Sequence, residues 1–146
     1  MSAVVKVSNV MMKSVVCVDR SATVFEAVYK MIESDVGCIV VLQDDEVVGI
    51  VTKGDVLRKG VLRELDPKST PVEKVMSKNV TTVGKEVTLE EASRLMSSKK
   101  VSKLPVLEDG RLVGIITSTD IIRTEPIMVG YLHELIKARF VPHELA

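Results

Sequence analysis

The feature that most constrains this sequence is a gapless internal repeat. Residues 10–59 align with residues 75–124, and the pairs Gly49 and Gly114, Asp55 and Asp120 share one interval of 65 residues. Both copies contain a Gly-hydrophobic-hydrophobic-Thr-x-x-Asp segment. A fixed internal period marks repeated supersecondary units that bury their apolar faces together. The chain is therefore predicted to form two similar halves about a pseudo-twofold axis, neither burying a full core alone.

Size and charge narrow the fold and the partners. At 146 residues and 16.0 kDa the chain has the size of one compact domain, which favours two repeats sharing one core. Lys plus Arg equals Asp plus Glu at 20 each, so the net charge attracts neither nucleic acid nor an anionic membrane. Aromatic residues are 3% with no Trp, which disfavours base stacking. Neither nucleic acid nor a membrane is a predicted partner.

The apolar runs and the cysteines bear on the compartment. No apolar run has the length of a membrane span, and the amino end lacks the pattern of a secretory signal, so the protein is predicted to be cytoplasmic. Cys17 and Cys38 are the two cysteines, both at the start of apolar strand candidates. We expect free thiols rather than a disulfide, and no metal site. A redox-sensitive wall at these two cysteines is a further hypothesis.

Each copy is predicted to run strand, helix, hairpin, helix. In the first copy a strand at residues 15–18 precedes a helix capped by Thr23, with Glu26 as its capping-box partner. Two apolar strands follow at 38–42 and 47–51, and a last helix at 53–61. The inward stripe of the first helix is predicted to consist of Val24, Ala27, Val28, Met31 and Ile32.

The second copy repeats this pattern. Thr88 and Glu91 form the cap of a helix ending near Ser98, and Asp109-Gly110 favours a type I′ hairpin turn. The inward face of this helix is predicted to consist of Leu89, Ala92, Leu95 and Met96.

Two prolines in residues 63–71 exclude a continuous helix and predict a linker. Residues 127–140 predict an amphipathic helical tail that acts as an intramolecular brace or a dimer contact, with Val129, Leu132, Leu135 and Ile136 on one side. The predicted divisions are 1–69 for the first repeat with its linker, 70–126 for the second repeat and 127–146 for the tail.

Enzyme motifs are incomplete. Residues 49–54 have the spacing of a P-loop, but Asp55-Val56 follows where Lys and Ser or Thr are required. His133-Glu134 begins a zinc-protease motif that Lys137 breaks. Both histidines, His133 and His143, lie in the tail and are predicted to be on the surface, which leaves no nucleophile-histidine pair. The protein is predicted not to be an enzyme.

Across about residues 7–125 the chain resembles a pair of cystathionine-β-synthase (CBS) domains, a Bateman module. The resemblance is carried by Val10-Met11 and Val75-Met76 before each first strand, by the capped helices and by the repeated segments ending at Asp55 and Asp120. It implies an α/β (α+β) fold of two pseudo-twofold-related β-α-β-β-α repeats, packed through their sheets into one compact module.

The resemblance also implies a regulatory ligand, and no required cofactor. The ligand class is AMP, ADP, ATP or an S-adenosylmethionine-like molecule, held between the copies in two crosswise clefts. One cleft would combine Val15, Val16, Cys17, Gly37, Cys38 and Ile39 with Thr117, Ser118, Thr119 and Asp120. The other would combine Thr81, Thr82, Val83, Ser102, Lys103, Leu104 and Pro105 with Thr52, Lys53, Gly54 and Asp55.

Within such clefts the aspartate would accept the ribose hydroxyls and the threonine would assist at ribose or phosphate. The helix starts at Lys53 and Ser118 are expected to offer free N–H groups to phosphate. Lys53 and Lys103 fall in the same cleft, which is therefore expected to hold phosphate better. The same threonines and aspartates also form capping boxes, so cap alone and cap plus ligand both remain open.

The leading hypothesis is a non-catalytic adenosine-ligand sensor that passes a change in orientation to an unidentified effector protein. The resemblance further implies a homodimer, in which helical faces carrying Val56, Leu57, Ile121 and Ile122 pair two modules into a disc, although these residues could equally be core. The alternative is a structural interaction or oligomerisation module with vestigial clefts. An enzyme acting on nucleotides is a third hypothesis.

Overall fold

The computed structural model describes residues 4–140, with side chains as far as residue 137. The chain forms two compact units. The first unit comprises Ser14–Val80 and Gly110–Leu112. The second unit comprises the residues up to Lys13, Thr81–Asp109 and the residues from Val113 onward.

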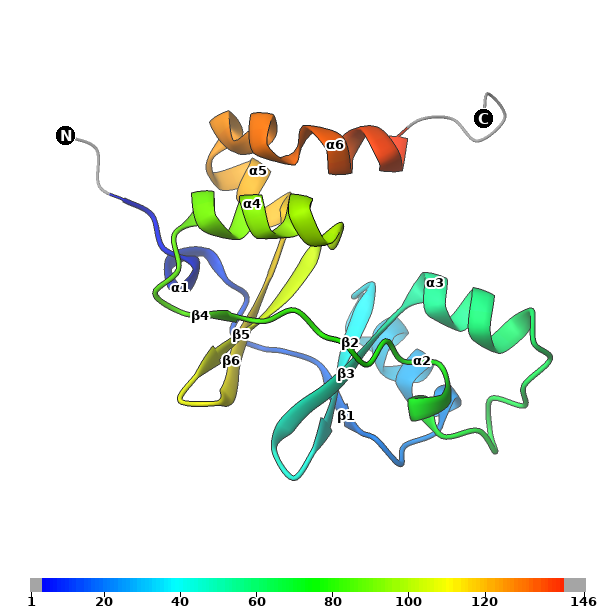
Figure 1. Cartoon of the computed structure of the whole chain (residues 1–146). Coiled ribbons are helices and arrows are strands. Elements are labelled where there is room, and N and C mark those ends of the chain that lie inside the picture. Colours follow the sequence, from blue (N-terminus) through cyan, green and yellow to red (C-terminus); the bar gives the residue numbers. More distant parts are fainter. Residues whose placement is uncertain (1–3, 141–146) are drawn as a thin grey trace. The chain divides into compact units, whose positions relative to one another are not determined.

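The first unit is built on a three-stranded sheet in the order β1-β2-β3 (Figure 1). Strand β1 is parallel to β2, and β2 is antiparallel to β3 with a bulge between Val41 and Leu42. Its elements are β1 (Cys17–Asp19), α2 (Val24–Glu33), β2 (Cys38–Gln43), β3 (Glu46–Thr52), α3 (Lys53–Asp55), the π-helix η1 (Val56–Val61) and the 3-10 helix η2 (Val72–Lys74). The predicted last helix is therefore present, but its larger part has π geometry.

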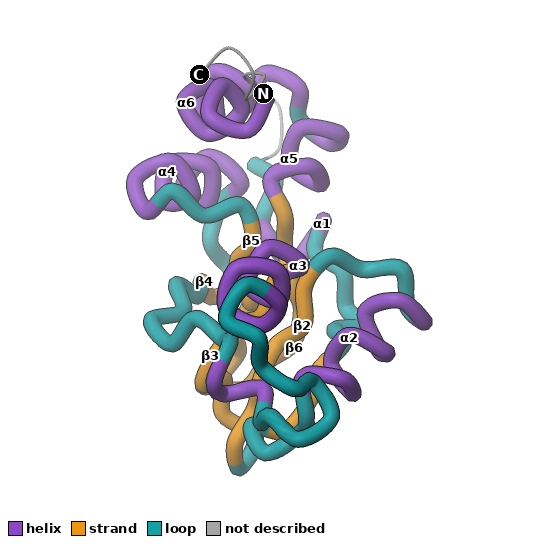
Figure 2. Tube along the Cα trace, turned by 90° about the vertical axis from the view of Figure 1, so that its right-hand side faces the viewer, coloured by secondary structure: helices purple, strands orange, loops and turns teal. Residues whose placement is uncertain are grey.

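The second unit repeats the sheet as β4-β5-β6. Its elements are α1 (Val7–Val10), β4 (Val83–Gly84), α4 (Leu89–Lys99), β5 (Lys103–Glu108), β6 (Arg111–Thr117, of which the first two residues fall in the first unit), α5 (Ser118–Thr124), the 3-10 helix η3 (Pro126–Met128) and α6 (Val129–Phe140). Positive φ angles of 51° at Asp109 and 78° at Gly110 confirm the predicted hairpin turn. Helix α6 lies over α4, away from the sheet (Figures 1 and 2).

The long helices begin where their caps predict. Thr88 and Glu91 form a complete capping box. At α2 only half of the predicted box forms: Thr23 Oγ1 accepts a hydrogen bond from the Glu26 N–H at 3.1 Å, but the Glu26 side chain does not bond back to Thr23. The core positions Val24, Ala27 and Met31 of α2 are buried, as are Leu89, Ala92 and Met96 of α4. The prediction for Ile32 was wrong, because its side chain is 71% exposed. Ile32 lies about 100° around the helix from Met31, beyond the stripe that faces the sheet.

The buried residues form two cores, which corrects the expectation of one shared core. The first unit's core contains Val18, Val24, Ala27, Met31, Ile39, Val41, Val51, Val72, Val75 and Met76. The second unit's core contains Val7, Val83, Leu89, Ala92, Met96, Leu104, Val106, Ile116, Ile121 and Leu132.

Each core is completed by a segment from the start of the other copy. Val72, Val75 and Met76 lead into the second copy but pack in the first unit. There Ser77 forms an antiparallel bridge with Ile50, with N–H to O distances of 2.9 and 3.1 Å. The segment at the start of the first copy packs in the second unit in the same way. We call residues 5–12 and 72–77 the lead-in segments.

The lead-in segments explain why methionine and glycine recur together. A Cβ added at Gly49 would lie 2.3 Å from Met76 Sδ, and one at Gly114 would lie 2.4 Å from Met11 Sδ. In the second unit Met12 bridges Ile115, the counterpart of the Ser77 and Ile50 bridge. Glycine is therefore needed where the methionine of a lead-in segment crosses the last strand of the hairpin.

The predicted linker at residues 63–71 is non-helical, as expected, but it is packed. The Thr70 carbonyl accepts from the Val24 N–H and the Pro67 carbonyl from the Phe25 N–H, both at 2.9 Å. These contacts satisfy amides that the first turn of α2 leaves open.

The tail confirms the predicted helix as an intramolecular brace. Leu132 is fully buried and Leu135 and Ile136 pack against the second unit's core, whereas Val129 is 38% exposed. His133 is exposed as predicted, and His143 lies outside the described residues. Within residues 4–140 no helix combines the length and apolarity needed to cross a bilayer.

Candidate functional site

The two predicted ribose-binding turns have the same local geometry. In the first unit Asp55 Oδ2 accepts from the Thr52 N–H at 2.9 Å, and Thr52 Oγ1 accepts from the Asp55 N–H at 3.2 Å. In the second unit Thr117 and Asp120 make the same two bonds at 3.1 Å each. Both turns are thus complete capping boxes, and the capping role of these residues is confirmed.

The aspartates differ in their surroundings. The Asp55 side chain is 7% exposed, with its Oδ1 3.6 Å from Lys59 Nζ and 3.7 Å from Arg58 Nη2. The Asp120 side chain is 20% exposed, with Oδ1 3.6 Å from Arg123 Nη1. These ion-pair distances exceed the length of a good hydrogen bond. Each carboxylate therefore commits one oxygen to its cap and leaves the other loosely held.

The expected free N–H groups at Lys53 and Ser118 are not free. The Lys53 N–H donates to the Gly37 carbonyl at 3.1 Å, and the Ser118 N–H donates to the Ser102 carbonyl at 2.9 Å. The hairpin places the start of one strand beside the end of the next, which brings these pairs together. Among the described residues the amides of Gly54 and Thr119 have no acceptor, so the donors are one residue later than predicted.

Within the first unit, the sheet places residues assigned to the two different predicted clefts side by side. Cys38 pairs with Thr52 across β2 and β3, and the Val16 carbonyl accepts from the Val40 N–H at 3.0 Å. Ile39 is fully buried in the core, so its side chain faces away from any solvent-filled hollow. Only its backbone could meet a ligand.

The second unit arranges its predicted residues in the same way. Ser102 contacts the start of α5 through its carbonyl, and Lys103 begins β5. Leu104 and Val83 are core residues, Pro105 is buried, and Thr81 and Thr82 are half-buried before β4. The crosswise combination of residues from both units stays a prediction.

The cysteines form no disulfide, which confirms that expectation. The Cys17 thiol donates to the Val15 carbonyl at 3.6 Å, and Cys38 is buried. Burial raises the pKa of the Cys17 thiol, against a smaller opposing effect of the Lys30 ammonium. A raised pKa lowers the thiolate fraction, which weakens the redox hypothesis at Cys17.

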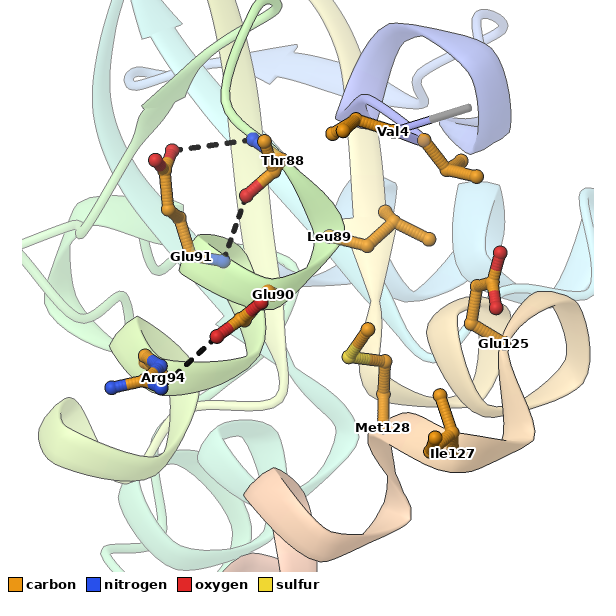
Figure 3. A pocket seen from close by; sticks show the side chains of 10 residues that line it. Val4, Thr88, Leu89, Glu90, Glu91, Arg94, Glu125, Ile127 and Met128 are labelled. Atoms are coloured by element: carbon orange, nitrogen blue, oxygen red, sulfur yellow. Dashed lines mark hydrogen bonds and ion pairs between the residues drawn. The ribbon is translucent and has the colours of Figure 1, made fainter. Parts of the chain in front are cut away.

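The second unit also contains a hollow of about 570 Å³ that the sequence did not predict (Figure 3). Leu89 and Met128 extend into it, and the carboxylates of Glu90 and Glu91 turn toward Arg94 and the Thr88 amide. Its lining comprises Val4, Val5, Thr88, Leu89, Glu90, Glu91, Arg94, Glu125, Ile127 and Met128. No local motif could reveal it, because three distant segments supply these residues. Within residues 4–140 no three His, Cys, Asp or Glu side chains gather as metal ligands.

Comparison with known proteins identifies both repeats. The CBS domain profile matches residues 7–61 and 72–126. The uncharacterised protein MK0525 of Methanopyrus kandleri is 34% identical over 91% of this chain and 69% of its own length.

Solved structures share the fold. The CBS domain protein TA0289 of Thermoplasma acidophilum, of unknown function, superposes with a TM-score of 0.81 at 25% identity, over 92% of this chain and 78% of its own. The CBS domain pair of protein MJ0100, solved with 5′-methylthioadenosine and S-adenosyl-L-methionine, has a TM-score of 0.76 at 24% identity over 84% and 96%. At that identity the likeness shows the fold alone.

Proposed function

Because this chain belongs to the CBS domain family, we propose that it is a non-catalytic regulatory module that binds an adenosine compound. The candidates are AMP, ADP, ATP and S-adenosylmethionine-like molecules. The carrying observation is the pair of matched turns, in which Asp55 and Asp120 each keep one carboxylate oxygen outside the cap. A carboxylate oxygen of this kind can accept from ribose hydroxyls.

Two further features support an anionic or polar ligand at these turns. The amides of Gly54 and Thr119 lie at helix starts, where a phosphate or a ribose oxygen would find a donor. The fold itself can hold such compounds, since the MJ0100 domain pair was solved with two adenosine derivatives.

We propose that each ligand contacts both copies in the crosswise combinations that the family resemblance implies. Lys53 and Lys103 would then favour a phosphate-bearing ligand at the Asp55 turn. Asp120, whose side chain is more exposed than that of Asp55, would be the more accessible ribose acceptor. The bound state would be recognised by an effector protein, and the chain would act as a homodimer.

Isothermal titration calorimetry with AMP, ADP, ATP and S-adenosylmethionine tests the proposal. Asp120→Asn and Asp55→Asn keep an acceptor for the cap but remove the carboxylate, and each should weaken its own ligand by roughly 1 to 3 kcal/mol. Glu91→Gln is the matched control, because Glu91 completes a capping box in α4 that no ligand is proposed to touch. Absence of millimolar or better binding to all four compounds would remove the basis of the proposal.

A further inference from the structure

The hollow in the second unit lies apart from the residues predicted to bind an adenosine compound. Its lining contains none of the residues assigned to either predicted cleft. Helix α5 has Thr117 before its first residue and Glu125 after its last, and the helix rise separates the two by about 12 Å. The hollow is therefore a second candidate site, and its volume of about 570 Å³ suits a small organic molecule.

Apolar side chains form one part of the lining. Leu89 and Met128 extend into the hollow, and Val4, Val5 and Ile127 add to its apolar surface (Figure 3). The hydrocarbon part of a ligand would be removed from water against these side chains, which is favourable. The polar part of the lining then decides which charge the ligand carries.

The lining contains three carboxylates and one guanidinium, which favours a cation over an anion. Glu90 Oε1 accepts from Arg94 Nη2 at 3.0 Å and from the Tyr131 hydroxyl at 2.9 Å. Glu91 accepts from the amide of its own N-cap residue at 3.3 Å. Glu125 is half-buried, and within residues 4–140 its carboxylate makes no hydrogen bond or ion pair. Figure 3 shows Leu89 between Glu125 and Glu90, so one carboxylate beside apolar surface is left for one cation.

In the first unit the linker occupies the equivalent place. The interval of 65 residues aligns Glu125 with Gly60. The Leu65 N–H donates to the Gly60 carbonyl at 3.1 Å, and the Pro67 carbonyl accepts from the Phe25 N–H at 2.9 Å. The linker thus connects the end of η1 with the first turn of α2, which correspond to two walls of the hollow in the second unit.

The linker also places a cation there. Lys68 Nζ lies 5.3 Å from the centroid of the Phe25 ring. The same interval aligns Phe25 with Glu90 and Lys68 with Ala3, so the second unit has a carboxylate in place of the ring and no lysine in place of Lys68. An ammonium on an aliphatic stem is therefore the group that the first unit holds in this place, and the second unit would take it from a separate molecule.

We infer that the hollow binds a small primary amine with an apolar body. The ammonium donates to the Glu125 carboxylate, and the apolar body lies against Leu89 and Met128. A charge-assisted hydrogen bond of this kind is about twice as strong as a neutral one. One charge matches the site, because the other two carboxylates already have partners. The inference does not depend on the binding of an adenosine compound.

Amide NMR spectra of the isotope-labelled full chain, titrated with n-hexylammonium chloride and without nucleotide, test the inference. The amide signals of Ile127 and Met128 should shift and reach saturation in the millimolar range. Hexan-1-ol has the same body without the charge, and it should bind at least about tenfold more weakly. Absence of saturable shifts with the amine, or equal affinity for the amine and the alcohol, overturns the inference.

A pair of variants tests the role of Glu125. Glu125→Gln keeps the shape of the side chain but removes its charge, and it should raise the dissociation constant of n-hexylammonium at least about tenfold. Glu134→Gln is the matched control, because it removes the same charge from an exposed position of α6 outside the hollow and should leave the constant unchanged. Equal weakening by both variants would show a general attraction by the charge of the protein and would overturn the assignment.

Discussion

The two Thr-x-x-Asp turns begin alike and continue differently. Both are closed by the same reciprocal hydrogen bonds, but Asp55 is nearly buried beside two cations, whereas Asp120 is more exposed and faces one. The π-helix η1 begins directly after Asp55, whereas Asp120 lies within the α-helix α5, which continues to Thr124. A shared motif thus fixes the backbone of a turn, while the residues after it decide how its carboxylate is used.

The same contrast extends to the two units. Their inner faces match position by position, because both must cover similar sheets, but their outer faces have diverged. The second unit carries its own covering helix, α6, and the first unit has no equivalent among the described residues. The second unit should therefore depend on α6 for stability in a way that the first does not.

The largest expected loss of stability tests whether the second unit depends on α6. Leu132→Ala should lower the unfolding free energy of the second unit by about 2 to 5 kcal/mol, because Leu132 is fully buried in that core. Urea unfolding followed by tyrosine fluorescence in a Tyr29→Phe background reports on the second unit alone, since Tyr131 is then the remaining tyrosine. Val129→Ala, at a 38% exposed position of α6, is the control. Equal losses for the two variants would contradict the docking of α6.

The glycines under the lead-in methionines should give the next largest effect. Gly49→Ala should destabilise by about 1 to 3 kcal/mol, because its Cβ would overlap Met76, which is 6% exposed and cannot move aside. Gly114→Ala should cost less, since Met11 is only half-buried. A double-mutant cycle with Met76→Ala measures the coupling, and strictly additive losses would show that Met76 is not the cause.

Substitution of the two aspartates should lower the stability of the protein to different extents, in addition to its effect on ligand binding. Asp55→Asn should cost about 1 to 2 kcal/mol, because a nearly buried carboxylate with two cationic neighbours loses its charge. Asp120→Asn should cost less than about 1 kcal/mol, since its single pair with Arg123 is exposed. Thermal unfolding at matched concentration compares the two. A larger loss of stability for Asp120→Asn than for Asp55→Asn would contradict the assignment of Asp55 to the more buried environment.

The smallest effect concerns the ion pairs that hold the lead-in segments. Arg20 Nε and Nη2 donate to Glu73 Oε2 at 3.1 and 2.6 Å, and Lys6 Nζ donates to Glu86 Oε2 at 2.6 Å. These hydrogen bonds hold the pKa of each glutamate below its usual 4.5.

A lowered pKa means that the folded state favours the charged carboxylate. The contribution is present above pH 4.5 and is lost as the pH falls through the folded-state pKa. Glu73→Gln should therefore reduce the dependence of stability on pH in the acidic range more than Glu86→Gln does, because Arg20 binds Glu73 through two donors whereas Lys6 binds Glu86 through one. Denaturation midpoints between about pH 3 and 7 measure it. Identical profiles for both variants would contradict the ranking.

Local features were predictable from the sequence because local chemistry decides them. The cap at Thr88, the turn at Asp109-Gly110 and the inward positions of α4 each depend on residues only a few positions apart. Ile32 was placed wrongly because an apolar side chain on the outer face of a helix has the same sequence pattern as one at the edge of its inner face.

The repeat could not predict that each lead-in segment packs in the unit formed mainly by the other copy. In a gapless duplication Met11 fits Gly49 and Gly114 equally well, since both glycines have the same neighbours. The same ambiguity produced the expectation of one shared core. The amides of Lys53 and Ser118 were expected to be free because their acceptors, Gly37 and Ser102, are at least 16 residues away in the chain.

The packing of each lead-in segment in the opposite unit also determines what happens when the chain is cleaved between the two copies. Cleavage between residues 69 and 70 would separate Val72, Val75 and Met76 from the sheet they cover, and would leave Val7 on a fragment without its own partner core. Neither fragment would then have a complete hydrophobic core, but each would contain the lead-in segment that completes the core of the other. When the two fragments are mixed, they should reassemble by complementation, because each contains a lead-in segment that packs in the core of the other.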